Sequence, residues 1–402
     1  MTVEMKKYRL ADIADFNKQT LSKKDSMDVI EYLDTGNLTE NIFGPMQILS
    51  RREAPSRAQR RVFDKTILYS TVRPRLKHYG FMEKPRENII VSTGFVTIDV
   101  KDEFKKVIDP YYLYLLLIQD KTTEYLGTIA DTAVSSYPSL NPSDIQMLEF
   151  EFPDLLTQKK IASILYNIDK RIENLRAQNH VLEQTAKTIY DYTFLQCAGH
   201  QTTYNKTLNR NIPTNWETDN LYRIADFTNG LACQKYRPIT EKDKLPVIKI
   251  REMHDGITAD TEFVRSDIPE KVIVNPGDLL FSWSASLEVM MWNGVKGGLN
   301  QHIFKVTPKE YFSLYYVYFQ LKDYIGNFKR MAEARKTTMG HITTDHLNQS
   351  RIAIPDEESM RKFNAQVTPL FKKQLVNSQQ IEALTTQRNT LLPLLMTGQI
   401  EV

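Results

Sequence analysis

The clearest hydrophobic pattern in the chain is a seven-residue repeat that follows Pro153. Large apolar residues recur every seven positions from Ile161, and a second row follows four positions after the first. This spacing places one apolar stripe along a helix and is typical of a coiled coil. The stripe consists of Ile161, Leu165, Ile168, Ile172, Leu175, Asn179, Leu182 and Ile189. Its burial would contribute on the order of 10–20 kcal/mol, so we predict a long helix over residues 153–197 that packs against another helix.

A weaker copy of the repeat follows Pro355. Its apolar members are Phe363, Val367, Leu370, Ile381, Leu384 and Leu391. Asn179 in the first stripe would fix the register of a helix pair at a cost in stability. Pro369 should kink the second helix, because proline removes one helical hydrogen bond. We expect the second helix over residues 353–402. Helices of about 40 residues span about 60 Å at 1.5 Å per residue. The two can pair with each other, and antiparallel pairing would put the two globular parts at opposite ends.

The rest of the chain also repeats. Ile13-Ala-Asp-Phe16 recurs unchanged as Ile224-Ala-Asp-Phe227, and Ile67-Leu-Tyr-Ser70 is echoed by Leu279-Leu-Phe-Ser282. An ordered series of such matches, at offsets of 202 to 212 residues, indicates a tandem duplication. We therefore expect two globular domains, at 1–152 and 213–352, with a linker at 198–212.

Each predicted domain combines short strand-like runs with a few helices. Turn signals such as Asn275-Pro-Gly-Asp278 separate the runs. The pattern predicts an α+β fold: a duplicated mixed α/β domain plus a long helix. The expected strands are Ile89–Val91, Phe95–Val100, Val247–Ile250 and Lys271–Val274, and the expected helices are Tyr111–Thr123 and Tyr311–Arg330.

Composition narrows the class of protein. The 402 residues are 41% hydrophobic and 25% charged, as in ordinary globular proteins. No apolar run approaches the roughly 20 residues of a membrane span, and the N-terminus lacks the apolar region of a signal peptide. Only Cys197 and Cys233 occur, which disfavours a disulfide framework or a cysteine-based zinc site. We expect a protein of the reducing cytoplasm, with no membrane partner.

Charge is unevenly distributed along the chain. The net charge is only +3, yet residues 51–86 carry 11 Lys and Arg against three acids. Such a field suits a polyanion, although a solvated basic loop is the alternative. The predicted DNA-binding residues in the first part of this segment are Arg51, Arg52, Arg57, Arg60 and Arg61.

No motif in the sequence supports catalysis. Asp109-Pro-Tyr-Tyr112 resembles an amino-methyltransferase motif but lacks its second proline, and no glycine-rich loop or Walker loop is present. Glu241-Lys-Asp-Lys244 lacks the upstream acid of a nuclease site. His341 and His346 have no evident third metal ligand, so we expect no metal site.

Polar loops at equivalent positions of the repeat suggest binding instead. They follow the Leu-Tyr-Ser and Leu-Phe-Ser strands. Arg suits guanine edges, Asn and Gln suit adenine, and Lys, Arg and Thr suit phosphates. Each residue taken singly is more often a surface group than a base reader. The candidates are Arg73, Arg75, Lys77, Ser136, Tyr137, Arg251, Trp283, Ser284, Ser286, Asn300, Gln301, His302, Arg335, Lys336, Thr337, Thr338 and His341.

With these features the chain resembles the specificity subunit of a type I restriction–modification system. The resemblance covers nearly the whole chain. Its motifs are the duplicated architecture, the helix opening at 152–165, the tail Arg388-Asn-Thr-Leu-Leu-Pro-Leu-Leu-Met-Thr-Gly-Gln399, Tyr112-Leu-Tyr-Leu-Leu-Leu117 and Gly277-Asp-Leu-Leu-Phe-Ser282. Two features depart from the family pattern: Pro369, and Asp356-Glu-Glu-Ser359 in place of a proline-leucine opening.

The resemblance implies a non-catalytic DNA-binding subunit. Two target-recognition domains would each read half of a split double-stranded DNA sequence, and an antiparallel coiled coil would set the gap between the halves. The helices would dock methyltransferase subunits, usually two, and restriction subunits would join that core. No cofactor is expected on this chain. S-adenosylmethionine, ATP and Mg are expected on the partner subunits.

Two other classes of protein remain open from the residues alone. One is a catalytic DNA methyltransferase or nuclease with an unrecognised site. The other is a coiled-coil interaction protein that binds no nucleic acid. Assays of methyl transfer and cleavage by the purified chain test the first class, and salt-dependent DNA binding tests the second.

Overall fold

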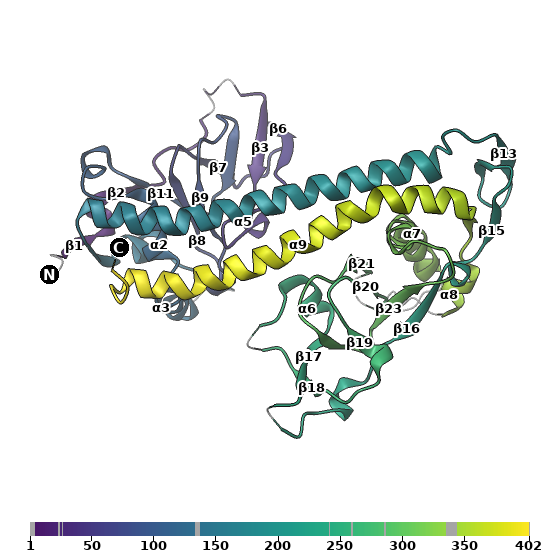
Figure 1. Ribbon diagram of the computed structural model, residues 1–402. Helices are drawn as coiled ribbons and strands as arrows, with labels where there is room; N and C mark the ends of the chain where they lie inside the picture. The colour runs from purple at the N-terminus through teal and green to yellow at the C-terminus, as the bar shows by residue number, and fades with distance from the viewer. Residues whose placement is uncertain are drawn as a thin grey trace. The chain divides into compact units, whose positions relative to one another are not determined.

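The computed structural model describes residues 5–22, 25, 27–132, 137–240, 242–258, 260–284, 287–334 and 344–401. The chain divides into two compact units. One combines Met1–Arg171 with Leu384–Val402, and the other comprises Ile172–Ala383. Both units mix sheets and helices, as the sequence predicts (Figure 1).

The first unit contains two four-stranded sheets. The central one has the order β2-β11-β8-β9 with antiparallel neighbours, and the other has the order β6-β3-β10-β7, in which β3 and β10 run parallel. Helices α2 and α3 follow, and α2 packs its aromatic residues against β9. The bounds are β2 Ala14–Phe16, β3 Val29–Leu33, β6 Gln47–Ser50, β7 Ala58–Arg61, β8 Thr66–Ser70, β9 Tyr79–Met82, β10 Ile89–Ser92, β11 Phe95–Val100, α2 Pro110–Leu117 and α3 Asp120–Asp131.

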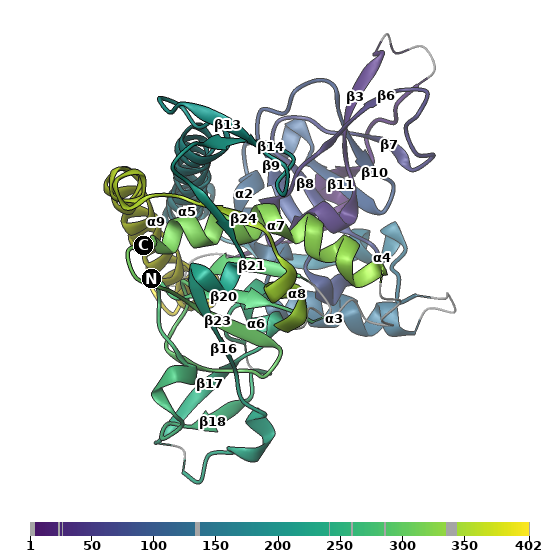
Figure 2. The same ribbon diagram turned by 90° about the vertical axis from the view of Figure 1, so that its right-hand side faces the viewer.

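The second unit repeats this arrangement strand for strand. Its sheets have the orders β16-β23-β20-β21 and β18-β17-β22-β19, and β17 and β22 are again a parallel pair. Helix α7 covers the first of these sheets (Figure 2). The duplication predicted from the sequence is therefore confirmed. The bounds are β16 Ala225–Asn229, β17 Lys244–Ile248, β18 Phe263–Arg265, β19 Ile273–Val274, β20 Leu279–Ser282, β21 Glu288–Met291, β22 Gly297–Leu299, β23 Ile303–Pro308 and α7 Leu314–Ala334.

A two-stranded ribbon stands before each long helix. In the first unit β1 (Lys6–Arg9) pairs with β12 (Glu149–Phe152), and in the second β15 (Glu217–Asp219) pairs with β24 (Ile352–Ile354). Each ribbon joins the beginning of a globular part to its end. The smaller elements are α1 Leu10–Ile13, β4 Leu38–Thr39, β5 Ile42–Phe43, α4 Pro142–Gln146, β13 Thr202–Asn205, β14 Arg210–Pro213, α6 Ile250–Asp255, α8 Thr344–Gln349, and six 3-10 turns among the described residues at Thr35–Asn37, Pro74–Leu76, Asp102–Phe104, Leu221–Arg223, Cys233–Lys235 and Glu270–Val272.

Two long helices are the other main feature. Helix α5 spans Leu155–Tyr190 and passes into a π-helical turn at Asp191–Leu195, and α9 spans Glu357–Met396. An aspartate caps each start. Asp154 Oδ1 accepts from the backbone N–H groups of the second and third residues after it, at 2.9 and 3.1 Å, and Asp356 Oδ1 accepts from Ser359 N at 2.8 Å. These carboxylates satisfy amides that have no partner within the helix.

The two helices pair antiparallel, as predicted. In the first unit Asp169 of α5 meets Arg388 of α9, with 2.6 Å between Oδ1 and Nε. In the second unit Asn377 Nδ2 donates to Asn179 Oδ1 at 2.9 Å, and Asn179 Nδ2 donates to Ser378 Oγ at 3.1 Å. Higher numbers on α5 thus face lower numbers on α9.

Burial along the predicted stripes is uneven. The fully buried members are Ile161, Leu165, Ile172, Leu175, Phe363 and Val367. The half-buried members are Ile168, Asn179, Leu182, Ile189, Leu370, Ile381, Leu384 and Leu391. The buried members include Ile172 and Leu175 in the middle of α5, and several residues nearer the helix ends also join the globular cores. The core of the first unit includes Ile161, Leu165, Leu392 and Leu395, and that of the second includes Ala186, Tyr190, Phe363 and Val367.

Several predicted elements differ in detail. The segment expected to be one helix at Tyr111–Thr123 is two, because Gln119 has extended backbone angles (φ −61°, ψ 142°). Lys249 and Ile250 lie outside the strand that ends at Ile248, and they open α6. Lys271 and Val272 form a 3-10 turn before β19.

Helix α9 is continuous through Pro369, so this proline does not end it. Figure 1 shows α9 bending in its yellow-green half, as the missing proline amide allows. Within the described residues, no helix combines the length and the apolar character needed to cross a membrane.

Candidate nucleic-acid interface

In the second unit, several predicted binding residues meet at one end of the sheet. The strands β16, β23 and β20 are neighbours there. Trp283 directly follows β20, His302 directly precedes β23, and Asn229 ends β16. Trp283 Nε1 donates to Asn229 Oδ1 at 3.2 Å, and the Trp283 ring lies 5.5 Å from the His302 ring. The structure therefore brings Trp283 and His302 together and adds Asn229.

Asn229 is not among the residues predicted from the sequence. Its hydrogen bond to Trp283 joins residues 54 positions apart, which no local pattern reports. One signal was available: Asn229 lies two residues after the repeated Ile224-Ala-Asp-Phe227 motif, at a strand end. It is exposed to solvent.

The predicted triplet Asn300–His302 divides into two kinds of residue. Asn300 is buried, and its Oδ1 accepts from His302 N at 3.2 Å, so it supports the turn. Gln301 Nε2 lies 3.3 Å from His302 Nε2, and both side chains are half-buried. Gly230 fits closely beneath this turn, because an added Cβ would lie 2.2 Å from the Asn300 carbonyl oxygen. The backbone that carries Gln301 and His302 therefore has little room to move.

The equivalent strand end of the first unit has the same backbone connections. Thr71 N donates to Gly94 O at 2.9 Å, as Trp283 N donates to His302 O at 3.3 Å. Ser70 Oγ donates to Val72 O at 3.0 Å, and Ser282 Oγ donates to the buried Ser284 at its backbone oxygen, at 3.3 Å. The loops that follow Ser70 and Ser282, which the repeat predicts to be equivalent, are thus equivalent in structure.

In the first-unit loop, Arg73 stacks on an aromatic ring. Its guanidinium lies 5.1 Å from the centre of the Tyr137 ring, and Tyr137 is 59% exposed. Arg73 has a left-handed backbone (φ 48°) and donates its amide to Pro138 O at 2.9 Å. A cation over an aromatic face is held in orientation while its N–H groups stay available.

Arg75 and Lys77 are engaged differently. Arg75 Nε contacts Glu124 at 3.0 Å and its Nη1 contacts Asp131 at 2.6 Å, both on α3. Hydrogen bonds to Glu124 and then Asp131 raise the pKa of Arg75. Lys77 Nζ contacts Asp120 at 3.0 Å. In this structure both side chains attach the loop to α3, and their role as DNA contacts stays a prediction.

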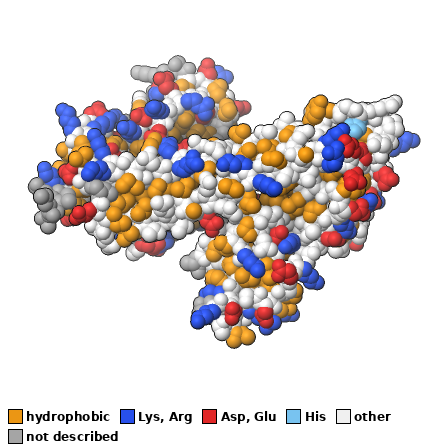
Figure 3. Space-filling view, viewed as in Figure 1, with side chains coloured by type: hydrophobic (Ala, Val, Ile, Leu, Met, Phe, Trp, Pro, Cys, Tyr) orange, Lys and Arg blue, Asp and Glu red, His pale blue; other side chains and the backbone are white. Residues whose placement is uncertain are grey.

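The basic segment is partly neutralised by acids outside it. Arg57 pairs with Asp34 at 2.9 Å, and Arg61 pairs with Asp25 at 3.4 Å. The sequence count covered residues 51–86 only and therefore missed these two partners. Figure 3 accordingly shows basic and acidic side chains interspersed on the visible surface.

The other arginines of the segment vary in exposure. Arg51 donates to the backbone oxygens of Ser22 and Asp25, so it holds two loops together. Arg60 is half-buried, and within the described part of the chain its Nε has no hydrogen-bond partner. Arg52 is exposed and forms no ion pair with any residue that the structure describes.

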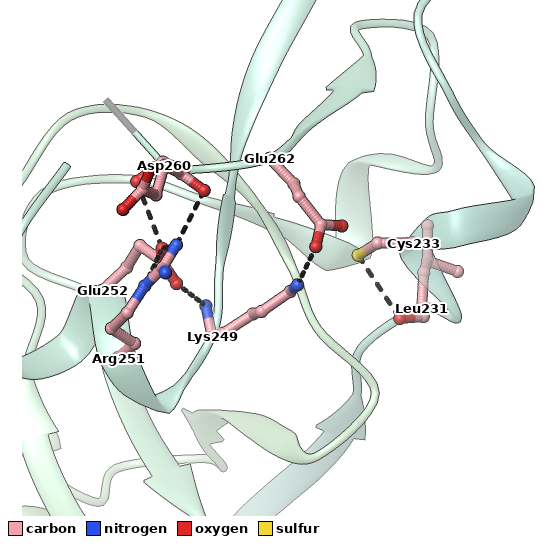
Figure 4. Close-up of polar contacts among 8 residues, drawn as sticks. Leu231, Cys233, Lys249, Arg251, Glu252, Asp260 and Glu262 are labelled. Carbon is pink, nitrogen blue, oxygen red and sulfur yellow. Dashed lines mark hydrogen bonds and ion pairs between the residues drawn. The ribbon is translucent and has the colours of Figure 1, made fainter. Parts of the chain in front are cut away.

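Arg251 forms an ion pair with a buried carboxylate, that of Glu252. Figure 4 shows its guanidinium directed at Glu252 and at the backbone oxygen of Asp260, with Nη2 distances of 2.8 Å to each. Glu252 is 1% exposed, so Arg251 neutralises a buried carboxylate. The hydrogen bond to Glu252 raises the pKa of Arg251. Lys249 similarly contacts Glu262 at 2.6 Å.

Seven predicted residues lie outside the described part of the chain. They are Ser136, Ser286, Arg335, Lys336, Thr337, Thr338 and His341. Among the described residues no group of three or more His, Cys, Asp or Glu could hold a metal ion. Both cysteines are buried, and burial raises the pKa of Cys233 to about 11.

The family described as type I restriction modification DNA specificity domain matches residues 2–184 and 213–386. The chain belongs to this family and carries its domain twice. It is the DNA-recognition component of a type I restriction–modification system, and the family is non-catalytic.

Relatives and a solved structure agree with this assignment. The HindI specificity subunit of Haemophilus influenzae is 24% identical, with 99% of this chain and 100% of that protein covered. The MjaIX specificity subunit of Methanocaldococcus jannaschii is 27% identical, over 85% of this chain and 79% of the relative. The fold resembles the type I restriction–modification S subunit of M. genitalium, with a TM-score of 0.57 at 15% identity and coverage of 98% and 96%.

Proposed function

We propose that the chain recognises a bipartite sequence in double-stranded DNA, and that residues 1–152 read one half and residues 213–352 the other. One observation carries this proposal: two sheets of the same strand order present polar side chains at the same strand end. A protein that read one continuous site would not need this arrangement twice.

The two helices, within residues 153–197 and 353–402, set the gap between the half targets in this proposal. They also dock two methyltransferase subunits, and restriction subunits join that core. S-adenosylmethionine, ATP and Mg then belong to the partners. The complex works in the cytoplasm, where the DNA of a prokaryotic cell lies. The antiparallel pairing supports the proposal that the helices set this gap, because two helices paired in a fixed register form a unit of fixed length.

The predicted contacts fall into two groups under this proposal. Arg73, Gln301 and His302 face base edges, because they extend from the strand ends. Arg52 and Arg57 contact phosphates, which position the protein and carry little sequence information. Binding should therefore weaken with salt, by about 0.9 in log–log slope for each phosphate contact.

The test is a domain exchange followed by mapping of modified bases. The chain is expressed with its methyltransferase partner, and methylated bases are mapped across the host genome with and without it. Exchanging residues 213–352 for those of a relative should change one half of the methylated sequence and leave the other. Exchanging only the linker at 198–212 is the matched control and should change neither half.

Two results would overturn the proposal. One is a change in both halves after a single exchange, which excludes independent reading. The other is the absence of any methylated sequence that depends on the wild-type chain, which excludes target recognition itself.

A further inference from the structure

We propose that Asn229 reads one base pair in the half target of the second unit, and that Trp283 is the positioning residue that holds its amide. This inference rests on the proposed function and names a specificity-determining residue within it. It begins from the hydrogen bond between the two side chains at the end of strands β16 and β20.

The chemistry of indole fixes how the amide is turned. The Trp283 Nε1–H group can only donate, so it must face the amide oxygen of Asn229 and not the amide nitrogen. The 3.2 Å contact between Nε1 and Oδ1 is therefore a constraint on the orientation of Asn229. The NH₂ group is left turned away from Trp283, on an exposed side chain.

Trp283 is itself held in place. Its ring packs against His302 at 5.5 Å and Phe304 at 6.0 Å, and its backbone N–H donates to His302 O. The Asn300 backbone lies so close to Gly230 that the segment following Asn229 has little room to move. An exposed amide on such a support loses little freedom when it binds, which favours selective contact.

An NH₂ group offered in this way selects base edges that accept hydrogen bonds. Guanine presents two acceptors in the major groove, N7 and O6, and thymine presents one, O4, beside its methyl group. Cytosine presents an amino donor, and adenine presents one donor beside one acceptor. Asn229 held by Trp283 therefore favours guanine on the strand that it contacts. Without Trp283 the amide could rotate by 180° and accept from an amino group as well.

The first unit supports this assignment independently. At the equivalent strand end, Arg73 carries only donors and is held over Tyr137. Both units thus have a hydrogen-bond donor held by an aromatic ring near the end of equivalent strands. In the first unit Arg73 is held by Tyr137 near the strand that ends in Ser70, and in the second Asn229 is held by Trp283 near the strand that ends in Ser282. Such a recurrence is expected where both ends meet the same kind of groove.

The decisive variant is Asn229→Asp, tested in the full chain with its methyltransferase partner. The carboxylate keeps an acceptor for Trp283 and has nearly the same shape, but it replaces the NH₂ donors by an acceptor. Its added charge weakens binding to every DNA, so the measurement is the ratio of affinities for duplexes that differ at one base pair. We expect this ratio to fall by about 5- to 150-fold at one position of the second half target, with preference moving toward cytosine.

Trp283→Phe tests the positioning role. It removes the indole donor and keeps an aromatic ring, so selectivity should relax at the same base pair as in Asn229→Asp. Trp292→Phe is the matched control, because Trp292 also donates through its indole N–H, at 2.8 Å to Val295 O, but sits in the core beside the opposite end of β20. That control should leave the base preference unchanged.

The outcomes separate this inference from the proposed function. The inference is supported if Asn229→Asp and Trp283→Phe both lose selectivity at the same base pair. If wild-type chain reads a bipartite target and Asn229→Asp keeps every base preference, Asn229 is not a base reader. If Asn229→Asp changes a base pair that Trp283→Phe leaves alone, Trp283 does not position it. A wild-type chain that selects no bipartite target defeats the proposed function instead.

Discussion

At the scale of single residues, neighbours of the same type have different roles. Arg73 and Arg75 lie two positions apart in one polar loop. Arg73 stacks on the exposed Tyr137, whereas Arg75 joins two carboxylates and lies against Gly127, where an added Cβ would be 2.7 Å from the Arg75 guanidinium carbon. The partners on α3 decide the difference, and they are about 50 residues away in the chain.

We therefore expect Arg73→Ala and Arg75→Ala to behave differently. Arg73→Ala should relax one base position of the first half target by about 1–3 kcal/mol and leave thermal stability unchanged. Arg75→Ala should lower thermal stability, because Glu124 and Asp131 lose their common partner, and should alter base selectivity less. Titrations with single-substituted duplexes and melting curves of both variants separate these effects. Equal loss of selectivity in both would contradict the distinction.

The same residues show which parts of the candidate interface could be predicted from the sequence. It found the loops after β8 and β20 because the repeat aligns them. It could not distinguish Arg73 from Arg75, or find Asn229, because their partners come from other strands and helices. The basic segment seemed more strongly charged than it is, since Asp25 and Asp34 precede it and reach it only after folding.

At the scale of elements, the helix pair has two polar pairs, one on each side of the buried Ile172 and Leu175 of α5. Heptads are local, so the sequence predicted both helices, and the resemblance to the family implied their antiparallel pairing. Burial lowers the pKa of Arg388, but the charge of Asp169, its hydrogen bond and the neighbouring Tyr114 and Tyr111 together outweigh burial, and the pKa is raised. Asp169 also accepts from Tyr111 Oη at 2.5 Å. A charge pair and an asparagine pair thus lie where the stripes lose their apolar residues.

The asparagine pair gives a prediction for stability. Asn377 is fully buried, and its Oδ1 accepts no hydrogen bond from any of the residues that the structure describes. Replacing both Asn179 and Asn377 by Leu should raise the free energy of unfolding of the second unit by about 1–3 kcal/mol. Asn377→Leu alone should lower it, because Asn179 Oδ1 loses its donor. Urea titrations measure this, and all three tryptophans, Trp216, Trp283 and Trp292, lie in the second unit and report on it.

Asn174→Leu is a suitable comparison, since Asn174 is exposed on α5 and the change should stay within about 0.5 kcal/mol. If the double variant were less stable than either single variant, the asparagines would be net stabilising and the interpretation would be wrong.

At the scale of the whole molecule, each globular part is completed by both long helices. Leu392 and Leu395 near the end of α9 belong to the same core as Ile161 and Leu165 near the start of α5. The first unit is therefore assembled from segments more than 200 residues apart. The repeat predicts each helix directly after its own domain and gives no sign of this sharing, because packing between distant segments leaves no pattern in a single sequence.

Leu395→Ala should reveal this arrangement. Leu395 is 2% exposed, so the change should cost about 2–5 kcal/mol, in the first unit. Circular dichroism of the whole chain should show an earlier transition, while tryptophan fluorescence, which reports only the second unit, should keep its midpoint. Val376→Ala on the 45% exposed side of α9 is the control and should move neither signal. A joint shift of both signals would mean that the chain unfolds as one cooperative system.

This shared core also sets an order of events during protein synthesis. Residues 172–383 must be made after the first sheets and before Leu392 and Leu395, which close the first core. At roughly 5–20 residues per second, that interval lasts on the order of 10–40 seconds. Throughout this time the apolar surface of the first unit lacks the end of α9, and the second core is completed only when Phe363 and Val367 have been made. The nascent chain should therefore depend on chaperones through its N-terminal half, although that half is made first.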